Sequence, residues 1–295
     1  MNTTPKSLQP REKNNDCLIV AAFQGRCIEG DPKSNFAKVI ELMQESEERK
    51  IDILCLPESF LHGYFSTKEK AWQHSIDLKS DSFRSMYDQL KKFSRTTLLL
   101  GLNEKDKDKI FNTVVVIENG QFLGKYRKAY TYPPYDYYSL GCDFPVFEKY
   151  GVKYSIIICL DSAFREPALI SALNGAQIIF CPMFNRVPKD ARMLHYLNRK
   201  SHFVSRAFDN QCWFIASDIV WDESDAQVCQ GYTTILDSDG QVVAQSQPFQ
   251  EMLLTYAIPM ELLKAEAMIK KTRRYGNPKL FEKVKIAYEN AITKK

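Results

Sequence analysis

The chain alternates between short apolar runs and longer segments in which apolar residues recur at helical spacing. The run Cys17–Phe23 is continuously apolar and predicts a buried strand. Asp31 and Pro32 then supply a helix N-cap and a proline at the first helical position. The helix that follows is amphipathic, because its apolar residues stand at i, i+3, i+4 and i+7, namely Phe36, Val39, Ile40 and Met43.

The same alternation continues to about residue 260. Further strands are expected at Ile51–Leu56, Thr97–Leu102, Phe111–Glu118, Gln121–Tyr126, Val152–Leu160, Gln177–Cys181, Cys212–Ser217, Tyr232–Leu236, Val242–Gln245 and Leu253–Ile258. Further helices are expected within 83–93, at Glu166–Asn174 and at Ala191–Phe208. The dipeptides Asn119-Gly120 and Asp239-Gly240 predict tight turns between antiparallel strands. The pattern therefore predicts a single α/β domain with mixed sheets and helices on the outside.

No repeat and no Gly-, Ser- or Pro-rich linker divides the chain. Residues 1–15 are polar and are expected to be flexible. Residues 16–260 are expected to form the domain, and residues 261–295 a charged C-terminal helix and tail. The basic residues of this tail, Lys270, Lys271, Arg273 and Arg274, indicate either a solvated face or an arm that contacts a partner subunit.

The composition argues against a disordered, a nucleic-acid-binding and a membrane-spanning protein. Of the 295 residues, 44% are hydrophobic and 26% are charged, which supports a large core and excludes a disordered chain. The net charge of +4 is too small to indicate a nucleic-acid partner. Apolar runs such as Tyr154–Leu160 are far shorter than the roughly 18 residues of a membrane span. The N-terminus has no apolar signal region. We therefore expect a soluble, cytoplasmic protein with no membrane partner.

Neither a metal nor an organic cofactor is expected. None of the eight cysteines forms a C-x-x-C pair, and the four histidines never stand four residues apart. A zinc site of ordinary spacing is thus disfavoured. The sequence also lacks the glycine-rich phosphate loops and the G-x-S-x-G motif of a serine nucleophile.

Three chemically active side chains follow predicted strands. Glu58 follows Ile51–Leu56, Lys128 follows Gln121–Tyr126, and Cys159 lies at the end of the run that begins at Val152. Ligands in α/β proteins gather at the carboxyl ends of strands, so these side chains are expected to meet. A thiol attacks a carbonyl as its thiolate and needs a base or cation beside it.

In this hypothesis Glu58 takes the proton of the Cys159 thiol, and Lys128 stabilises the thiolate and the later oxyanion. The backbone N–H of Leu160 is the second candidate oxyanion donor. Each side chain alone has a simpler interpretation: a solvated carboxylate, a solvated basic edge and a small core residue. Their joint occurrence in this order favours the chemical interpretation.

The three positions and their flanks resemble the nitrilase superfamily of carbon–nitrogen hydrolases, over roughly residues 17 to 258. Members carry Glu, Lys and Cys in this chain order, in motifs similar to Leu54–Glu58, Gly124–Lys128 and Cys159-Leu160-Asp161 through Glu166. The resemblance implies a four-layer α-β-β-α sandwich with two mixed sheets, which pairs with a second copy across a helical face. It also implies that Cys159 is the nucleophile, Glu58 the base and Lys128 the stabilising cation.

The chain departs from the family pattern at several positions. A second family glutamate is replaced by Asp136, and Arg165 stands where a proline is usual. Leu160 after the cysteine is nearer to the amide- and carbamoyl-cleaving branches than to true nitrilases. Nitrile hydrolysis on the same residues and a non-catalytic scaffold are the alternatives.

Aromatic residues near these motifs are candidates for the substrate pocket. Tyr64 follows Glu58 closely, and Phe184 and Asn185 follow a later strand. A cluster between the Lys and Cys motifs is either a pocket wall or a surface loop: Tyr130, Tyr132, Tyr135, Tyr137 and Tyr138. A small-molecule amide is the expected substrate, with Asp136, Leu160, Tyr64, Phe184 and Asn185 as candidate contacts.

Overall fold

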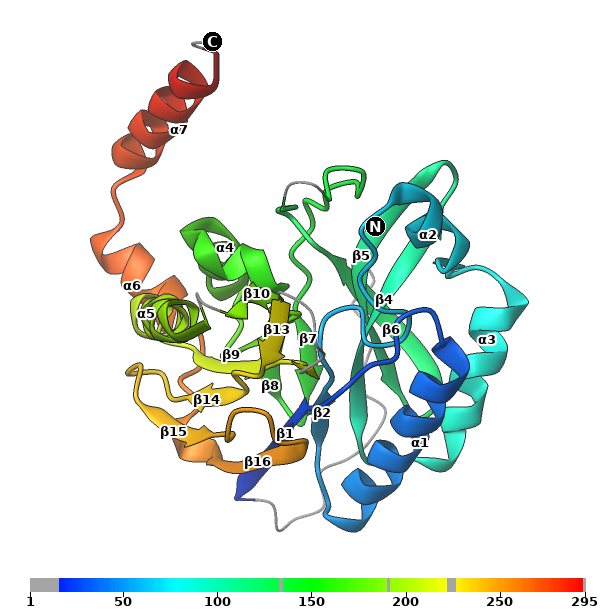
Figure 1. Ribbon diagram of the computed structural model, residues 1–295. Helices are drawn as coiled ribbons and strands as arrows, with labels where there is room; N and C mark the ends of the chain where they lie inside the picture. The colour runs from blue at the N-terminus through cyan, green and yellow to red at the C-terminus, as the bar shows by residue number, and fades with distance from the viewer. Residues whose placement is uncertain (1–15, 133–134, 190–191, 222–226, 294–295) are drawn as a thin grey trace.

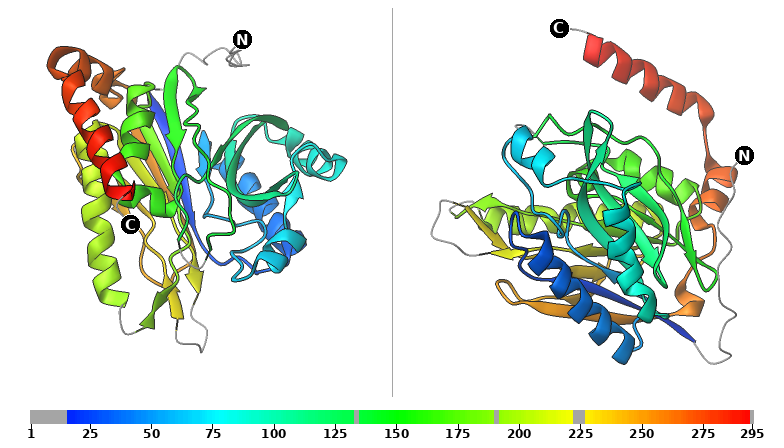
Figure 2. Two further views of the ribbon diagram at one scale, coloured as in Figure 1. Left: turned by 90° about the horizontal axis from the view of Figure 1, so that it is seen from above. Right: turned by 90° about the vertical axis from the view of Figure 1, so that its right-hand side faces the viewer.

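Two mixed β-sheets lie face to face at the centre of the molecule (Figures 1 and 2). The computed structural model describes residues 16–132, 135–189, 192–221 and 227–293. Residues 1–15, expected to be flexible, lie outside the described part of the chain.

The first sheet has the strand order β16-β1-β2-β4-β5-β6, and β3 pairs with β4. Three central strands, β1, β2 and β4, are parallel, and antiparallel strands flank them on both sides. The strands are β1 (Cys17–Gln24), β2 (Ile53–Cys55), β3 (Ile76–Asp77), β4 (Thr97–Asp106), β5 (Lys109–Glu118), β6 (Gln121–Arg127) and β16 (Met252–Pro259). The turn between β5 and β6 is Asn119-Gly120, and both residues have positive φ, as the sequence predicts.

The second sheet repeats this plan with the order β15-β14-β11-β9-β8-β7. Its parallel strands are β8, β9 and β11, again with antiparallel neighbours on both sides. The strands are β7 (Phe147–Lys149), β8 (Val152–Ile156), β9 (Ile178–Pro182), β11 (Trp213–Ser217), β14 (Thr234–Leu236) and β15 (Val242–Gln245). A small separate sheet has the order β10 (Val187–Pro188), β13 (Gln227–Gln230), β12 (Val220–Trp221).

Helices cover the outer face of each sheet (Figures 1 and 2). Helices α1 and α3 lie on the first sheet, and α4 and α5 lie on the second. The helical elements are α1 (Pro32–Glu48), α2 (Lys68–Gln73), α3 (Asp81–Asp88), η1 (Gln89–Lys92), η2 (Cys159–Ala163), α4 (Arg165–Leu173), α5 (Arg192–Asn210), η4 (Met260–Leu262), α6 (Ala267–Tyr275) and α7 (Pro278–Thr293). The arrangement confirms the predicted four-layer α-β-β-α sandwich.

Strand β1 shows why both faces of a sheet must be apolar in this architecture. Leu18, Val20 and Ala22 belong to the core between the two sheets. The alternate residues Ala21 and Phe23 belong to the core beneath the first helical layer. A strand with two buried faces appears in sequence as an uninterrupted apolar run, which is how this strand was predicted.

The two sheets are joined at the ends of β1 and β11. Gly25 and Ile219 form a parallel bridge there, and the Ser217 hydroxyl donates to the Phe23 carbonyl over 2.9 Å. The junction fixes the relative position of the loops that follow these two strands.

The expected strand Val152–Leu160 is shorter in the structure. β8 ends at Ile156, and the chain turns at Cys159, whose φ is +43°. The 3-10 helix η2 begins at this residue. An apolar run predicts burial, and here Ile157, Ile158 and Cys159 are buried outside the sheet, while the last residue of the run, Leu160, is half-buried.

The C-terminal helix α7 extends away from the body of the molecule (Figure 1). None of its residues is buried. Among the described helices, none has both the length and the apolar character needed to cross a membrane.

Candidate active site

Glu58 lies directly beyond the end of β2, in a loop that passes close to β4. Its backbone N–H donates to the Met183 carbonyl of the second sheet over 3.2 Å. A Cβ on Gly101 of β4 would lie 2.5 Å from the Pro57 carbonyl, so glycine is needed where the loop crosses this strand. The Glu58 side chain is buried.

Lys128 follows β6, and its ammonium group meets the Glu58 carboxylate. Lys128 Nζ lies 2.6 Å from Glu58 Oε1, and Asn112 Nδ2 of β5 donates to the same oxygen over 2.6 Å. Burial alone would lower the pKa of Lys128, but the negative charge of Glu58, with smaller contributions from Tyr64 and Cys159, raises it well above its ordinary value. Lys128 therefore stays a cation beside Glu58 at neutral pH.

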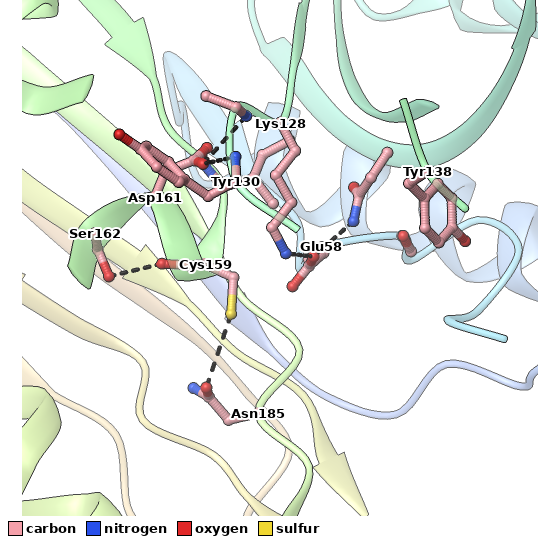
Figure 3. Close-up of polar contacts among 12 residues, drawn as sticks. Glu58, Lys128, Tyr130, Tyr138, Cys159, Asp161, Ser162 and Asn185 are labelled. Carbon is pink, nitrogen blue, oxygen red and sulfur yellow. Dashed lines mark hydrogen bonds and ion pairs between the residues drawn. The ribbon is translucent and has the colours of Figure 1, made fainter. Parts of the chain in front are cut away.

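Cys159 faces the same space from the second sheet (Figure 3). Its side chain is buried but reachable, with 8% of the residue exposed. The thiol donates to Asn185 Oδ1 over 3.9 Å. The Asn185 side chain is itself oriented, because its Nδ2 donates to Asp218 Oδ2 over 2.7 Å. This bond directs the amide oxygen of Asn185 toward the sulfur.

Asp161 holds the cysteine turn against the end of β6 (Figure 3). Its Oδ1 accepts from the backbone N–H groups of Ala129 and Tyr130 over 3.1 and 2.9 Å. Its Oδ2 accepts from the Tyr126 hydroxyl and the Ile158 N–H over 2.7 and 2.9 Å. Burial raises the pKa of Asp161 to about 6, although these bonds and the charge of Lys128 oppose the rise. One carboxylate thus ties the Lys128 segment to the Cys159 segment.

Aromatic rings gather around the side of the site that holds Lys128. Lys128 Nζ lies 5.5 Å from the ring centre of Tyr64. Around Tyr64 stand the rings of Tyr135, Tyr138 and Phe184, with centroids 4.6, 5.6 and 5.8 Å away. The Tyr64 hydroxyl is buried and has no hydrogen-bond partner among the described residues.

The structure thus brings together Glu58, Lys128 and Cys159, with Tyr64, Phe184 and Asn185 around them. Leu160 is half-buried next to the cysteine. Asp136 is not brought to this site. It is exposed at the turn Tyr135–Tyr138, whose neighbouring tyrosine rings pack inward against Tyr64.

The sequence analysis missed two polar residues of the site, Asn112 and Asp218. It also missed that Asp161 ties the Lys128 segment to the Cys159 segment. Asp161 and Asp218 follow apolar runs, which is the signal that revealed Glu58, whereas Asn112 lies inside an apolar strand and carried no such signal. In the described part of the chain, no group of three His, Cys, Asp or Glu side chains is placed to hold a metal ion.

The fold matches that of a known class of proteins. The structure is similar to that of Nit3 from Saccharomyces cerevisiae, a member of branch 10 of the nitrilase superfamily. The TM-score is 0.71 and the sequence identity 21%, over 84% of this chain and 92% of that one. The fold is therefore that of the nitrilase superfamily, as the sequence motifs indicated.

The family follows from the sequence comparison. The carbon–nitrogen hydrolase family model matches residues 19–267, and the chain belongs to this family. It is 29% identical to the 2-oxoglutaramate amidase of Bacillus subtilis over 224 residues, 73% of this chain and 81% of that protein. It is 25% identical to a nitrilase of Pyrococcus abyssi over 237 residues, 79% of this chain and 87% of that protein.

Proposed function

We propose that the protein hydrolyses a non-peptide carbon–nitrogen bond in an amide or N-carbamoyl compound, through a thioester on Cys159. The observation that carries the proposal is the buried Glu58–Lys128 pair, which faces the Cys159 thiol across one space (Figure 3). A carboxylate, a permanent cation and a thiol in one buried site suit nucleophilic acyl transfer.

In the first half of the reaction, Glu58 accepts the proton of the Cys159 thiol. The sulfur attacks the carbonyl carbon, and a C–S bond forms as the carbonyl oxygen becomes an oxyanion. The Lys128 ammonium and the Leu160 N–H stabilise this charge. The C–N bond then breaks, and the leaving nitrogen takes the proton from Glu58. Ammonia or an amine departs, and a thioester remains on Cys159.

In the second half, water replaces the departed amine. Glu58 takes a proton from the water as its oxygen attacks the thioester carbon. The C–S bond breaks, the acid product leaves, and Glu58 returns its proton to the Cys159 thiolate. The site is thereby restored, and no cofactor takes part in this scheme.

The amide and carbamoyl classes are favoured over nitriles by Leu160, which departs from the residues that usually follow the cysteine in true nitrilases. The experiment measures ammonia release from primary amides, N-carbamoyl compounds and the matching nitriles. Cys159→Ala and Cys159→Ser are expected to lower turnover by more than about 1000-fold. Exposed Cys142 offers a matched control, and Cys142→Ala is expected to keep full activity.

Undiminished ammonia release by the folded Cys159→Ala protein would contradict the proposal. Faster turnover of nitriles than of amides would favour the nitrilase alternative. If no substrate is turned over and Cys159 reacts with iodoacetamide no faster in the wild type than in Lys128→Ala, the protein is a non-catalytic member of the fold.

We also propose that the protein acts in the cytoplasm as a homodimer, with residues 261–295 as a subunit-contact arm. Large apolar side chains on α7 support the arm. Leu280, Val284, Tyr288 and Ile292 stand at intervals of four, and each is about 60% exposed. Such a stripe on a projecting helix is typical of a protein–protein contact.

A further inference from the structure

A second hollow lies beside the candidate active site. It is a cavity of about 230 Å³, lined mainly by residues 26–29, Phe184, Arg186 and residues 219–221. These segments follow β1, β9 and β11, so the cavity lies at the carboxyl ends of parallel strands from both sheets. The bridge between Gly25 and Ile219 fixes two of its sides.

Phe184 and Asn185 connect this cavity to the nucleophile. Asn185 accepts a hydrogen bond from the Cys159 thiol. The preceding residue, Phe184, lines the cavity and packs against Tyr64. The other side of the cavity also abuts the loop of Glu58. The Gly30 N–H donates to the His62 carbonyl over 2.9 Å, and a Cβ on Gly63 would lie 2.8 Å from the Glu29 Cα. An acyl chain attached at Cys159 thus has the cavity as its neighbour.

Arg186 is the polar group best placed to bind the acyl chain of the substrate. Its guanidinium lies 5.2 Å from the ring centre of Phe184 and 4.7 Å from that of Trp221. One Nη group contacts Glu29 Oε2 over 3.1 Å. The Nε is buried and has no hydrogen-bond partner among the described residues. A planar guanidinium held over aromatic rings, with an unused donor, suits side-on binding of a carboxylate.

The charge of the cavity agrees with an anionic ligand. Its charged lining residues are Arg26, Glu29 and Arg186, which leave one net positive charge. Glu29 is 39% exposed at its side chain, whereas Arg186 is 18% exposed, so the arginine is the more desolvated member of their pair. An incoming carboxylate would meet a cation whose existing partner lies toward solvent.

We propose that this cavity binds the acyl end of the substrate, that this end carries a carboxylate, and that Arg186 determines the specificity for it. The inference rests on the proposed amide hydrolysis and adds the substrate class to it. Arg186 is not one of the site residues that the sequence predicts. Its proposed role is to bind the substrate carboxylate, and it takes no part in bond making or breaking.

The kinetic test compares two primary amides of equal length, succinamate and butyramide, which differ in the terminal carboxylate. Wild-type kcat/KM is expected to be about 10- to 100-fold higher for succinamate, the range expected for a hydrogen bond to a charged group. Arg186→Gln is expected to bring this ratio close to one, mainly through KM. Arg186→Lys, which keeps the charge without the planar fork, is expected to retain part of the preference.

Two further variants give the test a signature that loss of structure would not produce. Glu29→Gln removes the internal competitor for Arg186 and is expected to raise succinamate kcat/KM by up to about fivefold, the scale of a partly exposed ion pair. Arg49→Gln removes a surface arginine paired with Glu45 on α1, and both substrates are expected to keep their wild-type values. An equal kcat/KM for the two amides in the wild type, or an equal loss of both in Arg186→Gln, overturns the inference.

A binding measurement separates this inference from the proposed function. Calorimetry on Cys159→Ala protein is expected to detect succinate but not butyrate, and the added Arg186→Gln change is expected to abolish succinate binding. If the wild type hydrolyses neither amide, the proposed function fails. The calorimetric result still shows whether the cavity binds a carboxylate through Arg186. Succinate binding that survives Arg186→Gln would show that the carboxylate is bound elsewhere.

Discussion

The Glu58 carboxylate accepts both of its described side-chain hydrogen bonds on one oxygen. Lys128 Nζ and Asn112 Nδ2 each lie 2.6 Å from Oε1. No other described group engages Oε2, so this oxygen is available to exchange protons with the thiol or with water. In the proposed mechanism, Oε1 would keep the carboxylate anchored while Oε2 acts as the base.

Tyr64 is the residue where function and stability are expected to oppose each other. Its buried hydroxyl has no partner among the described residues, so Tyr64→Phe removes an unsatisfied polar group. The free energy of unfolding should rise by about 1 kcal/mol, while KM for the amide should rise if the hydroxyl contacts substrate. Urea unfolding and initial rates measure the two effects.

Tyr138→Phe is the matched control for this prediction. The Tyr138 hydroxyl donates to Asn103 Oδ1 over 2.9 Å, and the ring stacks on Tyr64. Its removal should therefore lower the free energy of unfolding by about 1 kcal/mol. Equal destabilisation by both substitutions would show that the Tyr64 hydroxyl has a partner in the folded protein.

His62 makes the stability of the fold depend on pH. Burial, with a smaller contribution from His74, lowers the pKa of His62 to about 3, while an unfolded histidine titrates near 6.5. Between these values the unfolded chain binds the proton and the folded protein does not, so stability falls as pH falls. At pH 5.5 the loss should be about 1.4 kcal/mol relative to pH 7.5.

The measurement compares urea unfolding of the wild type and of His62→Gln at both pH values. Asp161, whose pKa is raised to about 6, changes stability in the opposite direction over this range, but its contribution is common to both proteins, so their difference isolates His62. A difference that does not change with pH would mean that His62 titrates in the folded protein as it does in the unfolded chain.

At the scale of elements, the long or strongly apolar segments were predictable and the short ones were not. β1 and α1 followed directly from an apolar run and from helical spacing. Helix α2 has six residues and a single buried one, Ala71, and β3 has only two residues, so neither leaves a periodic pattern. These elements form because the neighbouring chain is already in place.

The candidate site divides in the same way. Glu58, Lys128 and Cys159 stand beyond strand ends, which a sequence displays. Asn112 lies inside β5, and its contact with Glu58 joins residues 54 positions apart. The spacing from Lys128 predicts a site role for Asp136, but its side chain is exposed, and spacing does not show the contacts that Tyr135 and Tyr138 make with Tyr64. The pattern of apolar and polar residues predicts where a residue lies along a strand or helix. It does not predict which residues far apart in the chain come into contact.

The cysteine turn η2 is expected to depend on Asp161 more than on its own short length. Asp161→Asn keeps the shape of the side chain but presents an NH2 group to donors that need an acceptor. Two donors lose their partner, at about 1 to 3 kcal/mol each, so the free energy of unfolding should fall by about 2 to 6 kcal/mol. Urea unfolding measures the loss.

Asp77→Asn serves as the control for this substitution. The exposed Asp77 Oδ1 accepts one backbone N–H, from Lys79 over 2.8 Å, and an asparagine oxygen can replace it. The change there should stay within about 0.5 kcal/mol. A similarly small effect at Asp161 would show that the turn is held by other contacts.

At the scale of the whole molecule, each half of the sandwich supplies part of the site. The first sheet carries Glu58 and Lys128, and the second carries Cys159 and Asn185. The contact between Asp161 and the backbone at Ala129 and Tyr130 spans the two halves, as does the bridge at Gly25. The chemistry therefore requires that the two sheets keep their relative position, and packing between them has a functional as well as a stabilising role.

The arm α7 leads to a prediction about assembly. Leu280, Val284, Tyr288 and Ile292 are each about 60% exposed, so burial of the exposed part would contribute about 0.9 to 1.8 kcal/mol each, and twofold symmetry uses each contact twice. The gross gain of about 7 to 14 kcal/mol lies within the range of the cost of association, about 4 to 15 kcal/mol, and can offset it. Sedimentation equilibrium should therefore find a dimer in the wild type and a monomer after deletion of residues 277–295. Tyr288→Glu, which counts twice in the dimer, should weaken association, whereas Lys283→Glu, outside the stripe, should leave it unchanged. A dimer that survives the deletion would assign the interface to another face and leave the arm without this role.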